Sequence, residues 1–99
     1  MVEIRELPEF SDWMQALRDS VAGARIAARI RRLQLGNPGD VQAVGEGVSE
    51  LRVHLGPGYR VYFVMHGAEL VILLCGGEKK SQAKDIARAK ALAKDLMES

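Results

Sequence analysis

The spacing of hydrophobic and polar residues predicts a strand and two helices in the first part of the chain. Apolar and charged residues alternate from Val2 to Leu7, which predicts a short strand that Pro8 ends. Apolar residues then recur at helical spacing in two groups, first Phe10, Trp13, Met14 and Leu17, and then Ile26, Ile30 and Leu33. Asp19 or Ser20 can cap the second helix, and the run Gly36-Asn37-Pro38-Gly39 ends it.

Three strands in succession are predicted after an irregular connection from Asp40 to Gly47. We expect them at Val48–Leu55, Tyr59–His66 and Glu69–Cys75, with Gly56-Pro57-Gly58 and Gly67 as turns. The first two alternate, which is typical of strands with one buried face. The third carries an unbroken apolar run, which favours a central strand covered on both faces, and we expect Gly76-Gly77 to end it.

The residues that follow predict a C-terminal helix. Its expected buried stripe is Ile86, Ala89, Ala93 and Leu96. The order strand, two helices, three strands, helix predicts an α+β fold class. We expect a mainly antiparallel four-stranded sheet packed on an N-terminal helical pair, with the C-terminal helix added.

Length and composition narrow the class of protein further. A chain of 99 residues indicates a single domain, residues 1–99. The one cysteine, Cys75, lies in an apolar run and is expected to be a small buried residue. We find no signal-peptide pattern and no apolar stretch near the roughly 20 residues that span a bilayer, so we expect a cytoplasmic location. The histidines and the cysteine lack the spacing of metal ligands, and we expect no metal and no cofactor.

The distribution of charge points to a possible site. Formal net charge is only +1, yet between Leu51 and Gly67 the formal charges are Arg52 and Arg60 alone. If the Gly56–Gly58 turn is tight, one face of the strand pair gathers four side chains, because opposite Cβ atoms lie about 4.5–5.5 Å apart. They are Arg52, His54, Arg60 and Tyr62, and Lys79 and Lys80 would border them.

Such a face suits an RNA phosphodiester. Arginine binds phosphate through parallel hydrogen bonds, histidine moves protons near neutral pH, and a tyrosine ring stacks on an unpaired base. The same alternation also predicts an ordinary solvated sheet face, so spacing alone leaves both interpretations open. Four further arginines are most simply explained as a solvated helix face; they are Arg25, Arg29, Arg31 and Arg32.

Two strings carry a resemblance to a known family. ELRVHLGPGYRVYF, from Glu50 to Phe63, and LLCGGEKKSQ, from Leu73 to Gln82, resemble the RelE/ParE toxin superfamily. The resemblance is strongest to its HigB-like branch of addiction-module killer proteins. It covers nearly the whole chain, and GPGYRVYF is its most specific part.

The resemblance implies a RelE-like fold and the toxin of a type II toxin–antitoxin system. Such a toxin is a ribosome-dependent mRNA endoribonuclease that works through attack of a 2′-hydroxyl on the adjacent phosphate. The implied partners are a cognate antitoxin, expected to be a small helix-turn-helix protein, and the ribosome with its messenger RNA. No membrane is implied, and oligomers are expected only through the antitoxin complex.

Site residues follow from the matching positions. RelE-like enzymes carry basic residues where this chain has Arg52, His54, Arg60 and Lys79. On that basis His54 and Arg60 are predicted to be catalytic, with His54 transferring a proton and Arg60 stabilising charge in the transition state. Arg52 and Lys79 are predicted to contact phosphate. From the basic face itself we add Tyr62 and Lys80 as RNA contacts.

The chain also departs from that pattern. Many RelE-like enzymes use a tyrosine near the C-terminus, yet no tyrosine follows Tyr62, and Asp85 falls roughly at the matching position. The ParE branch inhibits DNA gyrase without cutting RNA. A non-catalytic gyrase-binding toxin is therefore the alternative function.

Overall fold

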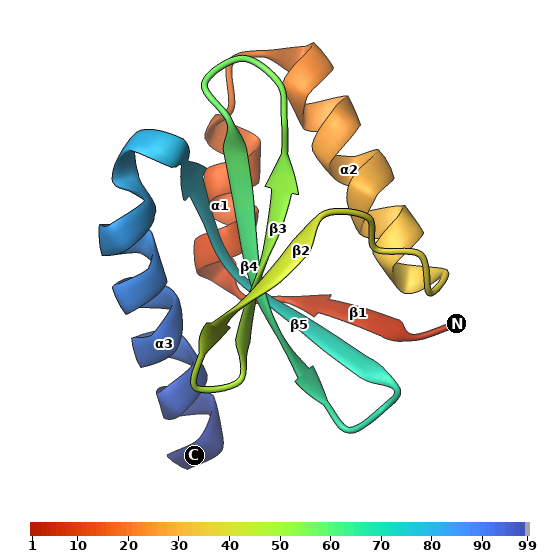
Figure 1. The fold of residues 1–99 in the computed structure, drawn as a ribbon, viewed down its shortest axis with the longest axis vertical. Coiled ribbons are helices and arrows are strands. Elements are labelled where there is room, and N and C mark those ends of the chain that lie inside the picture. The colour runs from red at the N-terminus through yellow and green to blue at the C-terminus, as the bar shows by residue number, and fades with distance from the viewer. Residues whose placement is uncertain (99) are drawn as a thin grey trace.

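The computed structural model describes residues 1–98, and within them five strands form one sheet flanked by three α-helices (Figure 1). The strands are β1 (Glu3–Glu6), β2 (Val41–Gly45), β3 (Val48–Val53), β4 (Tyr59–His66) and β5 (Leu70–Glu78). The helices are α1 (Pro8–Ala16), α2 (Ser20–Gln34) and α3 (Gln82–Glu98), with the short 3₁₀ helix η1 (Lys79–Ser81) before α3.

The sheet is mixed, with the strand order β1-β5-β4-β3-β2. β1 runs parallel to β5, and the other neighbouring strands are antiparallel. The α+β class is therefore confirmed. The expected four-stranded sheet is wrong by one strand, because the segment taken for an irregular connection contains β2.

Two separate apolar cores cover the two faces of the sheet. On one face, α1 and α2 contribute Phe10, Ala22, Ile26 and Leu33, which pack against inward residues of β3, β4 and β5. On the other face, Ala89 and Ala93 of α3 pack against Val48, Tyr62, Leu74 and Cys75. The predicted stripes of α2 and α3 are thus confirmed, and α3 lies across the sheet from the helical pair (Figure 1).

β2 was missed because it is a short edge strand. Only Val41 and Val44 in it are even partly buried, and its pairing with β3 is irregular between Ala43 and Gly45. The hairpin turn uses Glu46 and Gly47, both at positive φ, 55° and 80°. Positive φ at both central positions is the signature of a tight two-residue hairpin turn.

The paired glycines Gly76 and Gly77 do not end β5, which continues to Glu78. A Cβ on Gly76 would lie 2.2 Å from Trp13 of α1, and a Cβ on Gly77 would lie 1.8 Å from Asp85 of α3. The glycines therefore let helices approach the strand closely on both faces.

The structure also tests the expectations for Asp19 and Cys75. Asp19 caps α2 by accepting hydrogen bonds from the backbone N–H groups of Val21 and Ala22. Cys75 is 1% exposed, and burial raises the pKa of its thiol to about 11. Asp19 is thus confirmed as the cap and Cys75 as a buried apolar residue.

Candidate active site

The two arginines of the predicted site face each other across β3 and β4. Arg52 pairs with Arg60 in the register of these strands, and on the next strand Arg60 pairs with Gly77. Directly opposed residues project to the same side of a sheet, so both guanidinium groups lie on the face that α3 covers in part. The predicted gathering of the two arginines is confirmed, but the face is not open, because Arg60 is 6% exposed.

A buried carboxylate, which sequence reasoning missed, faces both arginines and compensates one of their two charges. Glu50 is completely buried, and its Oε1 lies 2.9 Å from Arg52 Nε and 3.7 Å from Arg60 Nε. Its Oε2 accepts a hydrogen bond of 2.8 Å from Gln82 of α3. Burial alone would raise the pKa of Glu50, but the hydrogen bonds from Arg52 and Gln82 outweigh it and hold the pKa below its ordinary value.

Strand alternation held the signal for Glu50, because it stands two residues before Arg52 and therefore on the same face. The sequence argument considered formal charges only between Leu51 and Gly67, and Glu50 lies one residue before that range. The Glu50 carboxylate makes the site a partly neutralised ion-pair cluster, in which two arginines and one carboxylate leave one net positive charge.

A hollow of about 310 Å³ opens beside Arg60 at the β3–β4 turn. Its lining includes His54, Arg60 and Lys79, together with the turn residues Gly56 to Gly58. The Lys79 backbone N–H donates to the Gly58 carbonyl over 2.8 Å, which fixes the start of η1 against the turn. Three of the side chains predicted from the family strings therefore meet at one concavity.

The Arg60 guanidinium is poorly satisfied by its own protein. Its Nε has no hydrogen-bond partner among residues 1–98. A Cβ built on Gly58 would lie 3.7 Å from Arg60 Nη1, which places that nitrogen beside the turn that lines the hollow. The Arg60 Nε has Glu50 Oε1 as an electrostatic partner at 3.7 Å but lacks a hydrogen bond within the described residues. A buried donor without a hydrogen bond is costly unless a ligand supplies an acceptor, so the Arg60 guanidinium is suited to an incoming anion.

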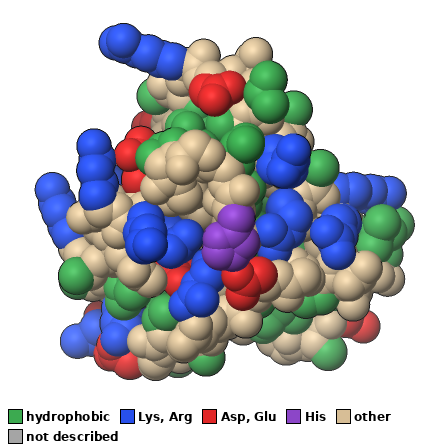
Figure 2. Space-filling view, turned by 45° about the horizontal axis from the view of Figure 1, so that its top comes forward, with side chains coloured by type: hydrophobic (Ala, Val, Ile, Leu, Met, Phe, Trp, Pro, Cys, Tyr) green, Lys and Arg blue, Asp and Glu red, His purple; other side chains and the backbone are tan. Residues whose placement is uncertain are grey.

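His54 stands just past the end of β3 and is largely exposed, with 68% of its side chain accessible. Its Nε2 lies 2.6 Å from Oδ2 of Asp40, the residue before β2. The hydrogen bond from His54 lowers the pKa of Asp40 below its ordinary value. Figure 2 shows a histidine in contact with an acidic side chain and flanked on both sides by Lys and Arg side chains. Asp40 was missed because only the pairing of β2 with β3 brings it here.

Arg29 of α2 binds the loop between α2 and β2, which contains Pro38 and Asp40, instead of lying in solvent. It donates to the carbonyl oxygens of Arg52, Pro38 and Asp40 at 2.6, 3.0 and 3.4 Å. The interpretation of Arg29 as part of a solvated helix face is therefore wrong. The other three arginines of that cluster, Arg25, Arg31 and Arg32, are exposed as expected.

Tyr62 does not lie on the exposed surface where it was expected. Its side chain is 0% exposed and belongs to the core between β4 and α3. Burial, followed by the negative charge of Glu50, raises the pKa of its phenol. A base cannot stack on this ring while α3 is seated, so the structure removes the reason for assigning it to RNA.

Lys80 is exposed to solvent and does not line the hollow. Its side chain is 85% exposed and its ammonium lies 3.8 Å from a Glu78 carboxylate oxygen. Asp85, at the position of the missing tyrosine, accepts a 2.5 Å hydrogen bond from the Ser81 hydroxyl and covers Gly77. Asp85 therefore packs against β5 and binds the Ser81 side chain near the site.

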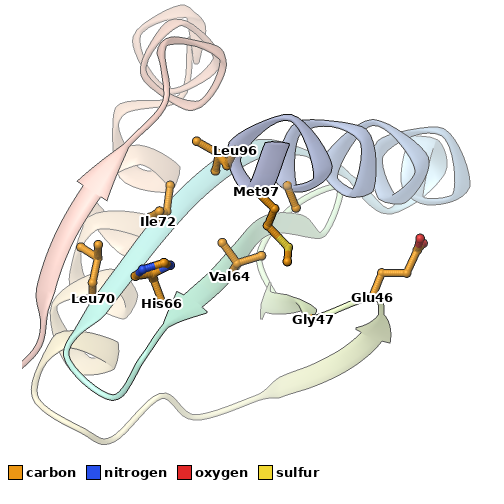
Figure 3. Close-up of a pocket in the computed structure, with 9 residues that line it drawn as sticks. Glu46, Gly47, Val64, His66, Leu70, Ile72, Leu96 and Met97 are labelled. Atoms are coloured by element: carbon orange, nitrogen blue, oxygen red, sulfur yellow. The ribbon is translucent and has the colours of Figure 1, made fainter. Parts of the chain in front are cut away.

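A second concavity lies at the other end of the α3 face. It has a volume of about 250 Å³ and is mostly apolar, with Val64, Leu70, Ile72, Leu96 and Met97 along its walls (Figure 3). His66 and Glu46 are the polar residues at its edge, and neither Arg52 nor Arg60 lines it.

No helix within residues 1–98 is long and apolar enough to cross a membrane. Across the same residues, no group of three or more His, Cys, Asp or Glu side chains could hold a metal ion.

Comparison with known proteins identifies relatives. The model of the family described as phage derived protein Gp49-like matches residues 12–98. An uncharacterized protein of Haemophilus influenzae is 48% identical over 95 residues, which cover 96% of this chain and 96% of that protein.

Proposed function

The chain belongs to the phage derived protein Gp49-like family, a RelE/HigB-like toxin family, and from this premise we propose that it is a toxin that cuts messenger RNA on the ribosome. The observation that supports this most is the buried Arg60 guanidinium, whose Nε makes no hydrogen bond in the described part of the chain and lies 3.7 Å from Glu50 Oε1, beside a hollow that His54 and Lys79 also line. The proposed class is a type II toxin–antitoxin toxin of the HigB-like branch, with a cognate antitoxin as partner.

The proposed reaction needs one base and concentrated positive charge. His54 takes the proton of a ribose 2′-hydroxyl, the 2′-oxygen bonds to the adjacent phosphorus, and the bond from phosphorus to the 5′-oxygen breaks. The 5′-oxygen takes a proton from water, and His54 later returns its own proton to solvent. The products are a 2′,3′-cyclic phosphate and a 5′-hydroxyl.

Three basic side chains stabilise the negative charge of the transition state in this scheme. Arg60 donates hydrogen bonds to the phosphoryl oxygens as negative charge grows there. In many enzymes, preorganised donors of this kind make the largest single contribution to the rate enhancement. Lys79, which lines the same hollow, also contacts the phosphate. Arg52 is engaged by Glu50 and by the Gln42 side chain, so its proposed contact with phosphate is electrostatic.

Cleavage by purified components tests the proposal. The protein, ribosomes and a translated message are expected to give new 5′-hydroxyl ends within the reading frame, and the same message without ribosomes is the control. Intact message under conditions where the protein arrests growth would contradict cleavage.

A gyrase-binding toxin stays as the second candidate. It is favoured by the absence of any tyrosine after Tyr62, whose own ring is buried. A DNA supercoiling assay separates the two functions, because only the gyrase-binding toxin should inhibit supercoiling by purified gyrase.

A further inference from the structure

Asp40 and His54 form a pair that the fold does not need for its core. Their side chains are 43% and 68% exposed, and the Asp40 Oδ2 to His54 Nε2 distance is 2.6 Å. An exposed ion pair typically adds little to stability. A contact this short between two accessible side chains, at the edge of the hollow that His54 lines, calls for a reason other than packing.

The backbone of Asp40 is held from two sides. Its carbonyl oxygen accepts from the Arg52 N–H over 3.0 Å and from Arg29 Nη2 over 3.4 Å. The preceding residue, Gly39, has a φ of +76°, and its ideal Cβ position is only 3.0 Å from Arg29. The carboxylate is therefore presented to His54 by a supported loop, even though the carboxylate itself is accessible.

The state of Asp40 fixes which ring nitrogen of His54 carries hydrogen. The hydrogen bond from His54 lowers the pKa of Asp40, so at neutral pH its carboxylate is ionised and can only accept. Nε2 must then be the donor. In the neutral imidazole this leaves the lone pair on Nδ1, because the hydrogen bond at one ring nitrogen determines the tautomer at the other.

We propose that Asp40 is a positioning residue that holds His54 in the Nε2–H tautomer and so makes Nδ1 the proton-accepting atom of the site. This inference rests on the proposed function and names a residue that neither the family strings nor the strand pattern identifies. When Nδ1 takes the 2′-hydroxyl proton, the imidazolium that forms stays bonded to a carboxylate at Nε2. Asp40 itself touches no substrate atom in this scheme.

Other charged groups around the pair do not duplicate this role. Arg52 on β3 and Arg29 on α2 act on Asp40 and, being cationic, favour its ionised form. Arg60 on β4 and Lys79 at η1 line the same hollow as His54 and are donors only. Asp40 is therefore the residue in this group that can accept from the imidazole.

The test compares Asp40→Asn with wild type in two measurements. The asparagine amide can donate to Nε2, which permits the Nδ1–H tautomer and removes the base. We expect single-turnover cleavage on the ribosome to slow on the order of 100-fold, within the range for general-base catalysis, with unchanged ribosome affinity. Asp40→Glu should recover part of the rate, and Asp12→Asn, which removes an equal charge on α1, should leave it unchanged.

Nitrogen NMR of the imidazole gives the second readout, with His54→Gln assigning the signals and His66 as internal reference. At a pH where the ring is neutral, wild type should show the Nε2–H tautomer, and Asp40→Asn should shift the population toward Nδ1–H. A wild-type Nδ1–H tautomer overturns the inference, as does an Asp40→Asn rate equal to that of Asp12→Asn. Wild-type protein that leaves message intact overturns the proposed function and the catalytic use of the pair, whereas the tautomer still decides whether Asp40 sets the state of His54.

Discussion

Arg52 and Arg60 lie directly opposite each other on β3 and β4, and one oxygen of Glu50 lies within reach of both Nε atoms, at 2.9 and 3.7 Å. Two like charges at opposed positions of a sheet repel each other, so the pair persists through this carboxylate. Gln82 binds the other oxygen, which connects the cluster to the first turn of α3. The site and the docking of α3 therefore share one buried group.

Glu50→Gln is expected to destabilise the protein. The amide keeps the shape of the side chain but removes its charge, and breaking a buried ion pair by losing one partner costs roughly 3 kcal/mol or more. Denaturant unfolding followed by circular dichroism measures the loss. Glu46→Gln is the matched control, because Glu46 is an exposed acid whose ion pair with Lys90 has a 3.5 Å separation. Equal stability of the two variants would contradict the role of Glu50.

The same carboxylate gives a predicted pH dependence. Its folded pKa lies below the ordinary value of 4.5, so its contribution to stability is fully present above about pH 4.5 and is lost as pH falls through the lower folded pKa. The free energy of unfolding should therefore decline more steeply below pH 4.5 in wild type than in Glu50→Gln. Parallel curves for the two proteins between pH 3 and pH 7 would exclude this linkage.

Gly77→Ala should disrupt the junction between β5 and α3. Its Cβ would lie 1.8 Å from Asp85 Oδ2, so α3 must move or Asp85 must turn away. Overpacking of this kind typically costs about 1–3 kcal/mol. Combining it with Asp85→Ala should recover part of the loss, which thermal unfolding can measure. Gly23→Ala in α2 is the control, since nothing lies within 4 Å of its new Cβ, and it should stabilise the helix by roughly 0.5–1 kcal/mol.

The sequence predicted the elements whose burial pattern is regular. The α2 stripe follows from its spacing, and the positions of Arg52 and Arg60 on neighbouring strands, with His54 just past the end of β3, follow from a tight turn at Gly56–Gly58. The alternation of β4 predicts one buried face, but the strand is buried on both faces from Tyr59 to Phe63, because α3 covers the second one. β2 has no such regular pattern, because an edge strand buries few of its side chains. The turn after it is also hard to predict, because Glu46 lies at a positive φ that few residues with a side chain adopt. The parallel pairing of β1 with β5 joins distant segments and leaves no local signal.

The two acidic residues of the site, Glu50 and Asp40, were also hard to predict from the sequence. Glu50 could have been found from alternation, since it shares a face with Arg52, but its complete burial depends on α3. Asp40 could not, since it reaches His54 only through a strand pairing that the sequence does not reveal. Gly76 and Gly77 predict a strand end from the sequence, although β5 continues through them, because a glycine pair marks a turn as readily as a close helix approach.

Arg60→Ala should abolish the proposed activity. Loss of a donor that stabilises charge in a transition state typically costs a few kcal/mol, which corresponds to a rate loss of about 100-fold or more. Growth arrest on induction and message cleavage by purified protein are the readouts. Arg31→Ala is the control, as Arg31 is an exposed arginine of α2.

Because Arg60 is almost fully buried, its removal can also affect folding. Arg60→Lys keeps the charge with a single ammonium and should remain folded, yet it should still be strongly impaired, because lysine lacks the planar fork. Full toxicity of a folded Arg60→Lys or Arg60→Ala protein would remove the main support for RNA cleavage.

Tyr62→Phe is expected to leave both stability and cleavage nearly unchanged. The ring is fully buried against α3, and its hydroxyl makes no hydrogen bond of ordinary geometry among the described residues, although burial and the nearby Glu50 carboxylate raise its pKa. Removing that hydroxyl should therefore change the free energy of unfolding by less than about 1 kcal/mol. Tyr62→Ala removes the ring itself and should cost roughly 3–5 kcal/mol, since α3 would lose its largest buried contact. Thermal unfolding and single-turnover cleavage of both variants check this. If Tyr62→Phe stayed fully stable but lost cleavage, the phenol would have to act in the reaction, and α3 would have to move away from the sheet when RNA binds.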